Sequence, residues 1–323
     1  MWSYLENTYS VIFHLFLYQD GDHVEVTESS ARDYGDLNHG TCLCSMLAYL
    51  LDGIETEIYV FEITEEYEGD AIPQPYRVLS ALNKIDSFNM AGSIEFKVVS
   101  MSFEIPYNTN IHDKITYLTE TYDTLFFASS GNANYDSSAR NKVYPSWYSE
   151  VFGVGGIIFK DETTFGPRMT IARGATYASM YYEHTYLKKS TPVVVAPGEK
   201  IEAINDATEG GIIEAVIVSG TSLSSPILAA VTLIMCILQD ELDSGARFDR
   251  NDLYACIALN SECDNRIFTN DITLKPGDDN YMHHEYRIGW GGVDFYDYVL
   301  WAYNYFKPSS GGGGGGGGGG SFR

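Results

Sequence analysis

The chain has 323 residues, of which 45% are hydrophobic, so it is long and apolar enough to bury a large core. Its 20 Lys and Arg residues face 44 Asp and Glu residues, which gives a net charge of −24. A charge of this sign repels nucleic-acid phosphates and anionic lipid headgroups, so we expect neither nucleic-acid binding nor a membrane-surface role. The five cysteines lack regular spacing, which indicates free thiols rather than a disulfide framework.

Short apolar runs with the length of β-strands alternate with helical or loop-like stretches along the chain. This alternation predicts an α/β fold with a mainly parallel sheet and helices on both faces. Polar residues that follow the strands would then meet at the carboxyl ends of the sheet, where such folds place their active sites. The runs cover residues 11–18, 57–63, 96–101, 125–128, 151–154, 193–196 and 215–218.

The chain begins M-W-S-Y-L-E-N, without the basic residues that open a signal peptide. The apolar run 11–18 that follows is short, and its length is typical of a core strand. The later apolar run 227–238 is too short to span a bilayer. We therefore expect no signal peptide and no transmembrane segment, which favours a cytoplasmic location.

Two candidate polar groups follow the first strand. Asp20 and Gly21 come directly after it, as a plain acidic turn or as a carboxylate placed at a strand end. His39 precedes apolar residues at helical spacing, so it lies at the start of an amphipathic helix; these residues are Leu43, Met46, Leu47, Leu50 and Leu51. At that place the imidazole is either a structural side chain or a general base.

Asn132 and Ser222 also stand where an apolar strand ends. Asn132 lies in F-F-A-S-S-G-N-A-N, and its amide either closes a turn or donates to a negatively charged oxygen. Ser222 lies in S-G-T-S-L-S-S-P, between a strand and the apolar run 227–238. Its hydroxyl is either a helix N-cap or a nucleophile beside the unpaired N–H groups of a helix start, which stabilise an oxyanion.

Together these segments resemble the subtilisin-like serine proteases, the subtilase family. The resemblance covers about residues 9–301 in the family's order, and four further segments carry it. V-V-S-M-S-F-E is similar to the family's substrate-binding strand. The other three resemble the segment after the oxyanion asparagine, a late strand and the closing helix. The four segments are residues 98–104, 144–156, 191–198 and 287–299.

The resemblance implies a three-layer subtilisin-like peptidase domain over residues 1–308, with a mainly parallel central sheet flanked by helices. It implies a serine endopeptidase that hydrolyses peptide bonds through an acyl-enzyme intermediate, with a peptide or protein as its partner. Ser222 would be the nucleophile and His39 the general base, and Asn132 would donate to the oxyanion together with the Ser222 N–H. Asp20 would be the triad aspartate, although it lies closer to His39 than the family's order leads us to expect. Without that carboxylate, the same fold would be a catalytically impaired pseudoprotease that binds peptides.

The resemblance also implies which residues contact the substrate: Ser102, Phe103, Glu104, Ser129, Ser130 and Gly131. Glu104 stands where the similar strand usually has glycine, and the chain as a whole is acidic. A carboxylate in a substrate cleft would favour basic or extended polar peptides. The alternative is an exposed charge at a strand edge that selects nothing.

The sequence contains no specific metal-binding motif. H-E-x-x-H and EF-hand spacings are absent, and the pair His283 and His284 is too sparse for a zinc site. We expect no required cofactor, although calcium is common among subtilases and the acidic stretches 240–252 and 278–279 leave a structural calcium ion open. Residues 309–323 contain ten consecutive glycines, which predicts a flexible tail outside the peptidase domain.

Overall fold

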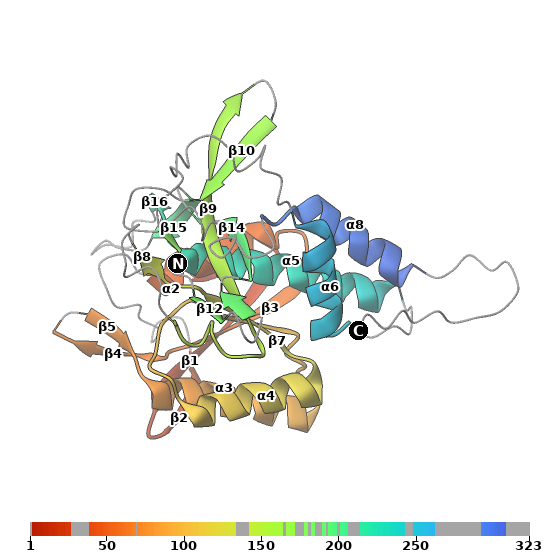
Figure 1. Ribbon diagram of the computed structural model, residues 1–323. Helices are drawn as coiled ribbons and strands as arrows, with labels where there is room; N and C mark the ends of the chain where they lie inside the picture. Colours follow the sequence, from red (N-terminus) through yellow and green to blue (C-terminus); the bar gives the residue numbers. More distant parts are fainter. Residues whose placement is uncertain are drawn as a thin grey trace, which may run out of the picture.

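The computed structural model of the chain is shown in Figure 1. It describes residues 2–26, 39–68, 70–133, 142–163, 166–171, 178–179, 182–184, 189–191, 193–198, 201–205, 214–242, 248–261 and 292–307. The predicted glycine-rich tail, the stretch 278–279 and the pair His283 and His284 lie outside these residues.

A three-stranded sheet forms the N-terminal part of the fold. Its order is β2-β1-β3, and it follows the short helix α1 (Trp2–Thr8). β1 (Val11–Gln19) pairs antiparallel with β2 (Asp22–Val26) and parallel with β3 (Thr56–Phe61). β1 and β2 are joined by the two residues Asp20 and Gly21, with φ 50° and 97°. Asp-Gly is the preferred sequence of such a two-residue hairpin, so the turn follows from the local sequence.

A five-stranded sheet forms the centre of the molecule. β6 (Val98–Met101), β7 (Leu125–Ser129), β9 (Val151–Thr163) and β14 (Val194–Pro197) pair parallel to one another, in the order β6-β7-β9-β14. β10 (Gly166–Ile171) pairs antiparallel with the second half of β9. The parallel core confirms the predicted α/β fold. β9 is longer than the predicted strand because it continues into the hairpin with β10.

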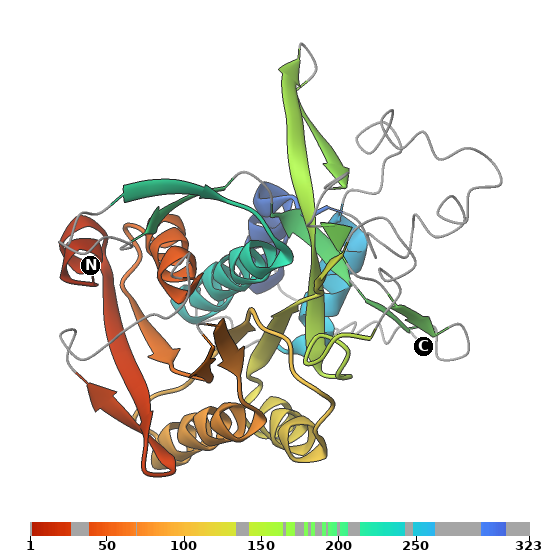
Figure 2. The ribbon, with the colours of Figure 1, turned by 90° about the vertical axis from the view of Figure 1, so that its left-hand side faces the viewer.

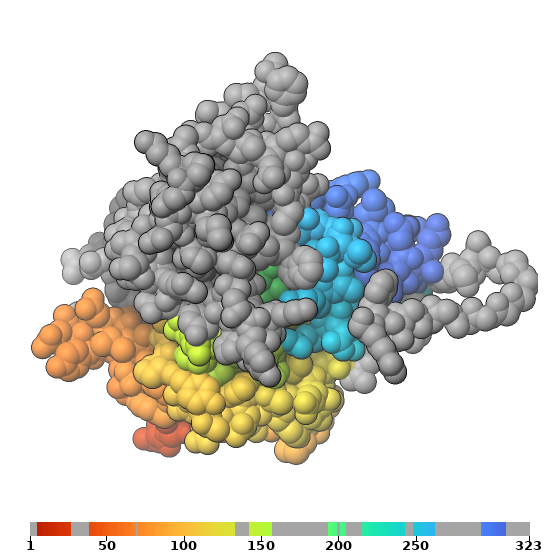
Figure 3. All heavy atoms as spheres, viewed as in Figure 1, coloured from red at the N-terminus to blue at the C-terminus, as the bar shows by residue number. Residues whose placement is uncertain are grey.

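Helices cover both faces of the central sheet, which gives three layers (Figures 1 and 2). Phe127 and Leu125 pack with α5, α6 and α8 on one face, and their neighbours Phe126 and Ala128 pack with α3 and α4 on the other. This alternation is that of a strand buried on both sides. The helices are α2 (His39–Leu50), α3 (Pro75–Ala91), α4 (Thr109–Tyr122), α5 (Thr221–Glu241), α6 (Arg250–Asn260) and α8 (Phe295–Phe306). In Figure 3, α4 forms much of the yellow surface at the bottom of the view.

Four smaller hairpins or strand pairs complete the described fold, and each is antiparallel. They are β4 (Thr64–Tyr67) with β5 (Asp70–Pro73), β8 (Asn132–Ala133) with β11 (Ala178–Ser179), β12 (Tyr182–His184) with β13 (Lys189–Thr191), and β15 (Ile201–Asn205) with β16 (Glu214–Val218).

Helix α5 runs through the middle of the molecule. It has 21 residues. The apolar run 227–238, which we expected to be too short for a bilayer, is only part of this helix, because α5 also includes the polar turn from Thr221 to Ser225. By length and hydropathy it is the one described helix that could cross a membrane. In its most apolar window, however, 72% of the residues are buried inside the protein, as expected of a core helix.

Candidate functional site

The first turn of α5 holds Ser222 at a crowded junction of three segments. Gly220 precedes the helix with φ 148°, in the region that favours glycine, and its N–H donates to Gly198 O at 2.6 Å. A Cβ atom on Gly198 would lie 2.3 Å from Ser224 Oγ and 3.1 Å from Gly156 Cα, so only glycine fits there. This close approach fixes the start of α5 against the ends of β14 and β9.

Asn132 lies beside this helix start, although 89 residues separate it from Thr221. Its Oδ1 accepts from Thr221 N at 2.9 Å and from Thr221 Oγ1 at 3.1 Å. The position that a Cβ atom of Gly220 would occupy lies 3.6 Å from Asn132 Nδ2 and 3.9 Å from Ser222 N. Both nitrogens therefore lie within 4 Å of one point, and an oxyanion site needs two donors near each other in this way. The structure brings together the two residues to which we assigned this role.

The segment after β6 contacts the same turn of α5. Ser102 Oγ donates to Ser222 O at 2.7 Å, and Ser100 Oγ lies 3.3 Å from Ser225 Oγ. Ser222 is half-buried, and its backbone carbonyl is held by the hydrogen bond from Ser102. Of the predicted substrate-contacting residues, Ser102 and Phe103 are half-buried beside this site.

The other predicted substrate-contacting residues differ in how they could meet a peptide. Ser129 and Ser130 have exposed fractions of 2% and 0%, so neither presents its side chain to a peptide at the surface. Gly131 is buried in a turn with φ 92°. Glu104 is exposed, and its carboxylate accepts a hydrogen bond from the backbone N–H of Asn132. Loss of surrounding water raises the pKa of Glu104, and this effect outweighs the hydrogen bond, which lowers it.

His39 is the first residue of α2 and is exposed. α2 packs along α5 (Figures 1 and 2), and its buried face contacts Ala230 of that helix. His39 lines a cavity of about 570 Å³ together with Gly40, Ser102 and Pro226. Ser222 itself does not line this cavity, but Ser102, which donates to Ser222 O, does; both His39 and Ser222 stand in the first turn of their helices.

Asp20 does not meet His39. It is exposed at the tip of the β1–β2 hairpin, and it forms no hydrogen bond or ion pair with any of the described residues, His39 included. Its assignment as the triad aspartate stays a prediction. The sequence left two interpretations of Asp20 and Gly21 open, and the geometry is that of the acidic turn.

On the face of β1 that packs against α2, the side chains are apolar. Successive side chains alternate between the two faces of a strand. The even-numbered Phe16 and Tyr18 contact aromatic rings on the α3 side. The odd-numbered Val11, Phe13 and Leu15 pack against α2.

Leu17 continues the α2-facing row and, like His39, lines the cavity. The alternation of apolar residues along β1 already indicates in the sequence that Leu17 shares the face of Leu15.

The described residues form no recognisable metal-binding site. Within those residues, no group of three or more His, Cys, Asp or Glu side chains is arranged to hold an ion. The absence of a required cofactor, and the possibility of structural calcium, stay predictions. Cys42, Cys44, Cys236 and Cys256 are buried free thiols.

Comparisons with known proteins identify the family and the fold of the chain. The family model described as "Subtilase family" matches residues 5–247. Among solved structures, the protease domain of PatA is similar, with 14% identity, a TM-score of 0.56, and coverage of 92% of this chain and 89% of that one. Sphericase matches with 17% identity, a TM-score of 0.54, and coverage of 78% and 82%.

The PatG macrocyclase domain matches with 13% identity, a TM-score of 0.51, and coverage of 94% and 95%. At these identities the structural likeness shows the fold alone. No curated protein matches the chain.

Proposed function

The chain belongs to the subtilase family, and from this premise we propose that it is a serine endopeptidase that hydrolyses peptide bonds through an acyl-enzyme intermediate. One observation carries the proposal: Asn132 Nδ2 and Ser222 N both lie within 4 Å of one point beside Gly220, at the start of α5. Donors fixed in this way stabilise the charge that develops on a carbonyl oxygen under attack, and in acyl transfer such stabilisation often accelerates the reaction more than any other effect. Membership of the family supports a serine peptidase in general, and the endopeptidase activity is the proposal.

In the proposed reaction, Ser222 Oγ attacks the carbonyl carbon of the peptide bond while His39 takes the hydroxyl proton. The carbonyl oxygen becomes an oxyanion between Asn132 Nδ2 and Ser222 N. The intermediate collapses, the C–N bond breaks, and His39 returns the proton to the leaving amine. Water then attacks the ester with help from His39, which releases the acid and restores the serine.

A second candidate function follows from the place of Asp20. A neutral imidazole needs an orienting group to hold its tautomer and to stabilise its charged form. Asp20 does not contact His39, and Leu17 on the α2-facing side of β1 is apolar. Without a carboxylate on the imidazole, the same fold would be a slow enzyme or a pseudoprotease that binds peptides. Catalysis does not vanish without the carboxylate, because the oxyanion donors and binding retain a large share of it.

The proposal is tested by treating the protein with a fluorophosphonate, which reacts with an activated serine. We expect labelling of the wild type and complete loss in Ser222→Ala. Ser93→Ala, which changes an exposed serine just after α3, is the matched control and should label like the wild type. Hydrolysis of a peptide library by the same proteins should follow the labelling. Absence of Ser222-dependent labelling would contradict the peptidase and leave peptide binding as the function.

A further inference from the structure

Glu104 lies next to the groups that would act on the peptide bond. Its carboxylate accepts from the backbone N–H of Asn132, whose side chain is one of the two converging donors. Two residues earlier, Ser102 contacts the backbone of Ser222. A carboxylate is therefore held one hydrogen bond away from the oxyanion region, on the surface that a peptide would cover.

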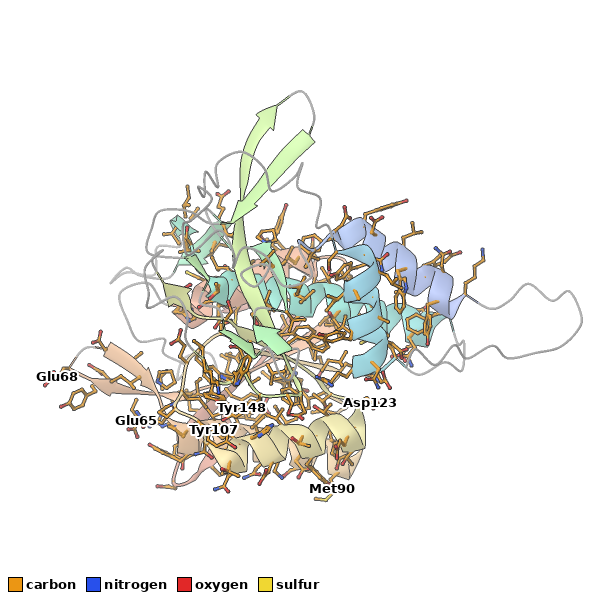
Figure 4. The ribbon with its side chains drawn as sticks, viewed as in Figure 1. Glu65, Glu68, Met90, Tyr107, Asp123 and Tyr148 are labelled. Carbon is orange, nitrogen blue, oxygen red and sulfur yellow. The ribbon has the colours of Figure 1, made fainter. Side chains whose placement is uncertain are left out.

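The segment that carries Glu104 is anchored on both sides. Before it, Ser102 Oγ donates to Ser222 O at 2.7 Å, and after it, Ile105 N donates to Tyr144 O at 3.0 Å. Further along, the ring of Tyr107 packs against those of Tyr144 and Tyr148, with centroids 5.1 and 5.8 Å away. Figure 4 shows Tyr107 and Tyr148 side by side above the α3–α4 layer. These contacts fix the backbone on which Glu104 stands, so its carboxylate is positioned rather than free to move with a loop.

Glu104 lacks a cationic partner in the described part of the protein. The ion pairs of lysine and arginine there involve Glu62, Glu65, Asp22, Glu95 and Asp86 instead. Partial loss of surrounding water raises the pKa of Glu104, and no positive charge among the described residues opposes this effect. A carboxylate in this condition gains from any cation that enters its surroundings.

We propose that Glu104 is a specificity-determining residue, which receives the lysine or arginine side chain of the substrate residue whose carbonyl lies between Asn132 and Ser222. The inference rests on the proposed function for the place of that carbonyl. A long cationic side chain reaches past the oxyanion region to the carboxylate. The negative charge of the whole protein also attracts cationic peptides, so it favours the same substrates.

Peptidyl diphenyl phosphonates test the proposal, because Ser222 bonds to the phosphorus and phenol leaves, so the residue beside the reactive atom is known. Two probes would differ only at that residue, acetyl-Ala-Ala-lysine and acetyl-Ala-Ala-norleucine phosphonate. We expect the lysine probe to react about tenfold faster with the wild type, the size of one hydrogen-bonded charge pair. In Glu104→Gln the ratio of the two rates should fall to about one. Glu66→Gln, which removes an exposed charge on β4, should keep the wild-type ratio.

The ratio of the lysine rate to the norleucine rate is taken within each variant, so any general loss of Ser222 reactivity affects both rates equally and cancels. Binding of the matching lysine and norleucine peptides to Ser222→Ala, followed by fluorescence anisotropy, gives a second readout that needs no reactive serine. Failure of both phosphonates and of the fluorophosphonate to label Ser222 would overturn the peptidase, while the binding measurement still decides the role of Glu104. Equal affinities for the two peptides, or a preference for lysine that survives in Glu104→Gln, would overturn the inference.

Discussion

The two sides of the candidate site are built in different ways. On the α5 side, short contacts join residues that lie far apart in the sequence. Asn132 Oδ1 accepts from Thr221 N at 2.9 Å, Ser102 Oγ donates to Ser222 O at 2.7 Å, and Gly220 N donates to Gly198 O at 2.6 Å. On the side of β1 and α2, Asp20 and His39 do not contact each other: His39 is exposed, and Asp20 lies at a hairpin tip without a partner among the described residues.

This difference separates two requirements of acyl transfer. Stabilising an oxyanion requires fixed donors, and the contacts around α5 provide them. Activating the serine requires an imidazole held in the correct tautomer, and the strand that would provide its carboxylate carries Leu17 at the α2-facing position. In the proposed reaction the two requirements fall to different parts of the site, oxyanion stabilisation to Asn132 and the start of α5, and proton transfer to His39. Substitutions on either side should show this separately.

Removing the side chain of Asn132 should have the largest effect. We expect Asn132→Ala to reduce the labelling rate of Ser222 about a hundredfold, because one of two oxyanion donors is lost. It should also lower the melting temperature, because Thr221 N loses its acceptor. Asn132→Asp is the matched control for this second effect, since its carboxylate still accepts from Thr221 N but cannot donate.

Asn132→Asp should therefore lose reactivity but keep its melting temperature. Thermal unfolding and fluorophosphonate kinetics on both variants check the prediction. Full reactivity in Asn132→Asp would show that the amide of Asn132 only caps the helix.

Placing a carboxylate on β1 should have a smaller effect of opposite sign. We expect Leu17→Asp to raise the labelling rate of Ser222 by roughly tenfold, because the new carboxylate would orient His39 from the strand face that points to α2. Val24→Asp is the matched control: Val24 is the cross-strand partner of Leu17, so the same charge is added one strand further away.

Melting temperatures must accompany the rates for Leu17→Asp, since the substitution replaces a half-buried apolar side chain. If Leu17→Asp stays folded and reacts no faster than Val24→Asp, the position of the missing carboxylate is wrong.

The sequence allowed the α5 side to be predicted better than the β1 side, for a physical reason. The start of α5 can be recognised from the local sequence, because a glycine, small polar residues and a long apolar run indicate a helix N-terminus whatever the tertiary fold. The pairing of Asn132 with this turn is a tertiary contact, and only the resemblance to a family connected the two segments. The fold class followed from the alternation of strands and helices in the same way.

Asp20 shows where such reasoning ends. A strand followed by Asp-Gly indicates a carboxylate at a strand end and a tight hairpin equally well; the pairing of β1 with β2 shows the hairpin, and the catalytic assignment stays a prediction. That pairing depends on residues 22–26, whose pattern in the sequence is weak. The buried side chains of Ser129 and Ser130 were equally unpredictable, because burial on both faces of β7 depends on helices distant in the chain.

The most direct test of the difference between the two sides is the labelling rate of Ser222 in Asp20→Asn, measured with the fluorophosphonate against the wild type. Our account predicts rates that agree within about twofold, because Asp20 forms no hydrogen bond or ion pair with the described residues and a neutral side chain at the hairpin tip would leave the site unchanged. A fall of about a thousandfold or more would contradict it, since a loss of that size is expected only when the carboxylate that orients the catalytic imidazole is removed.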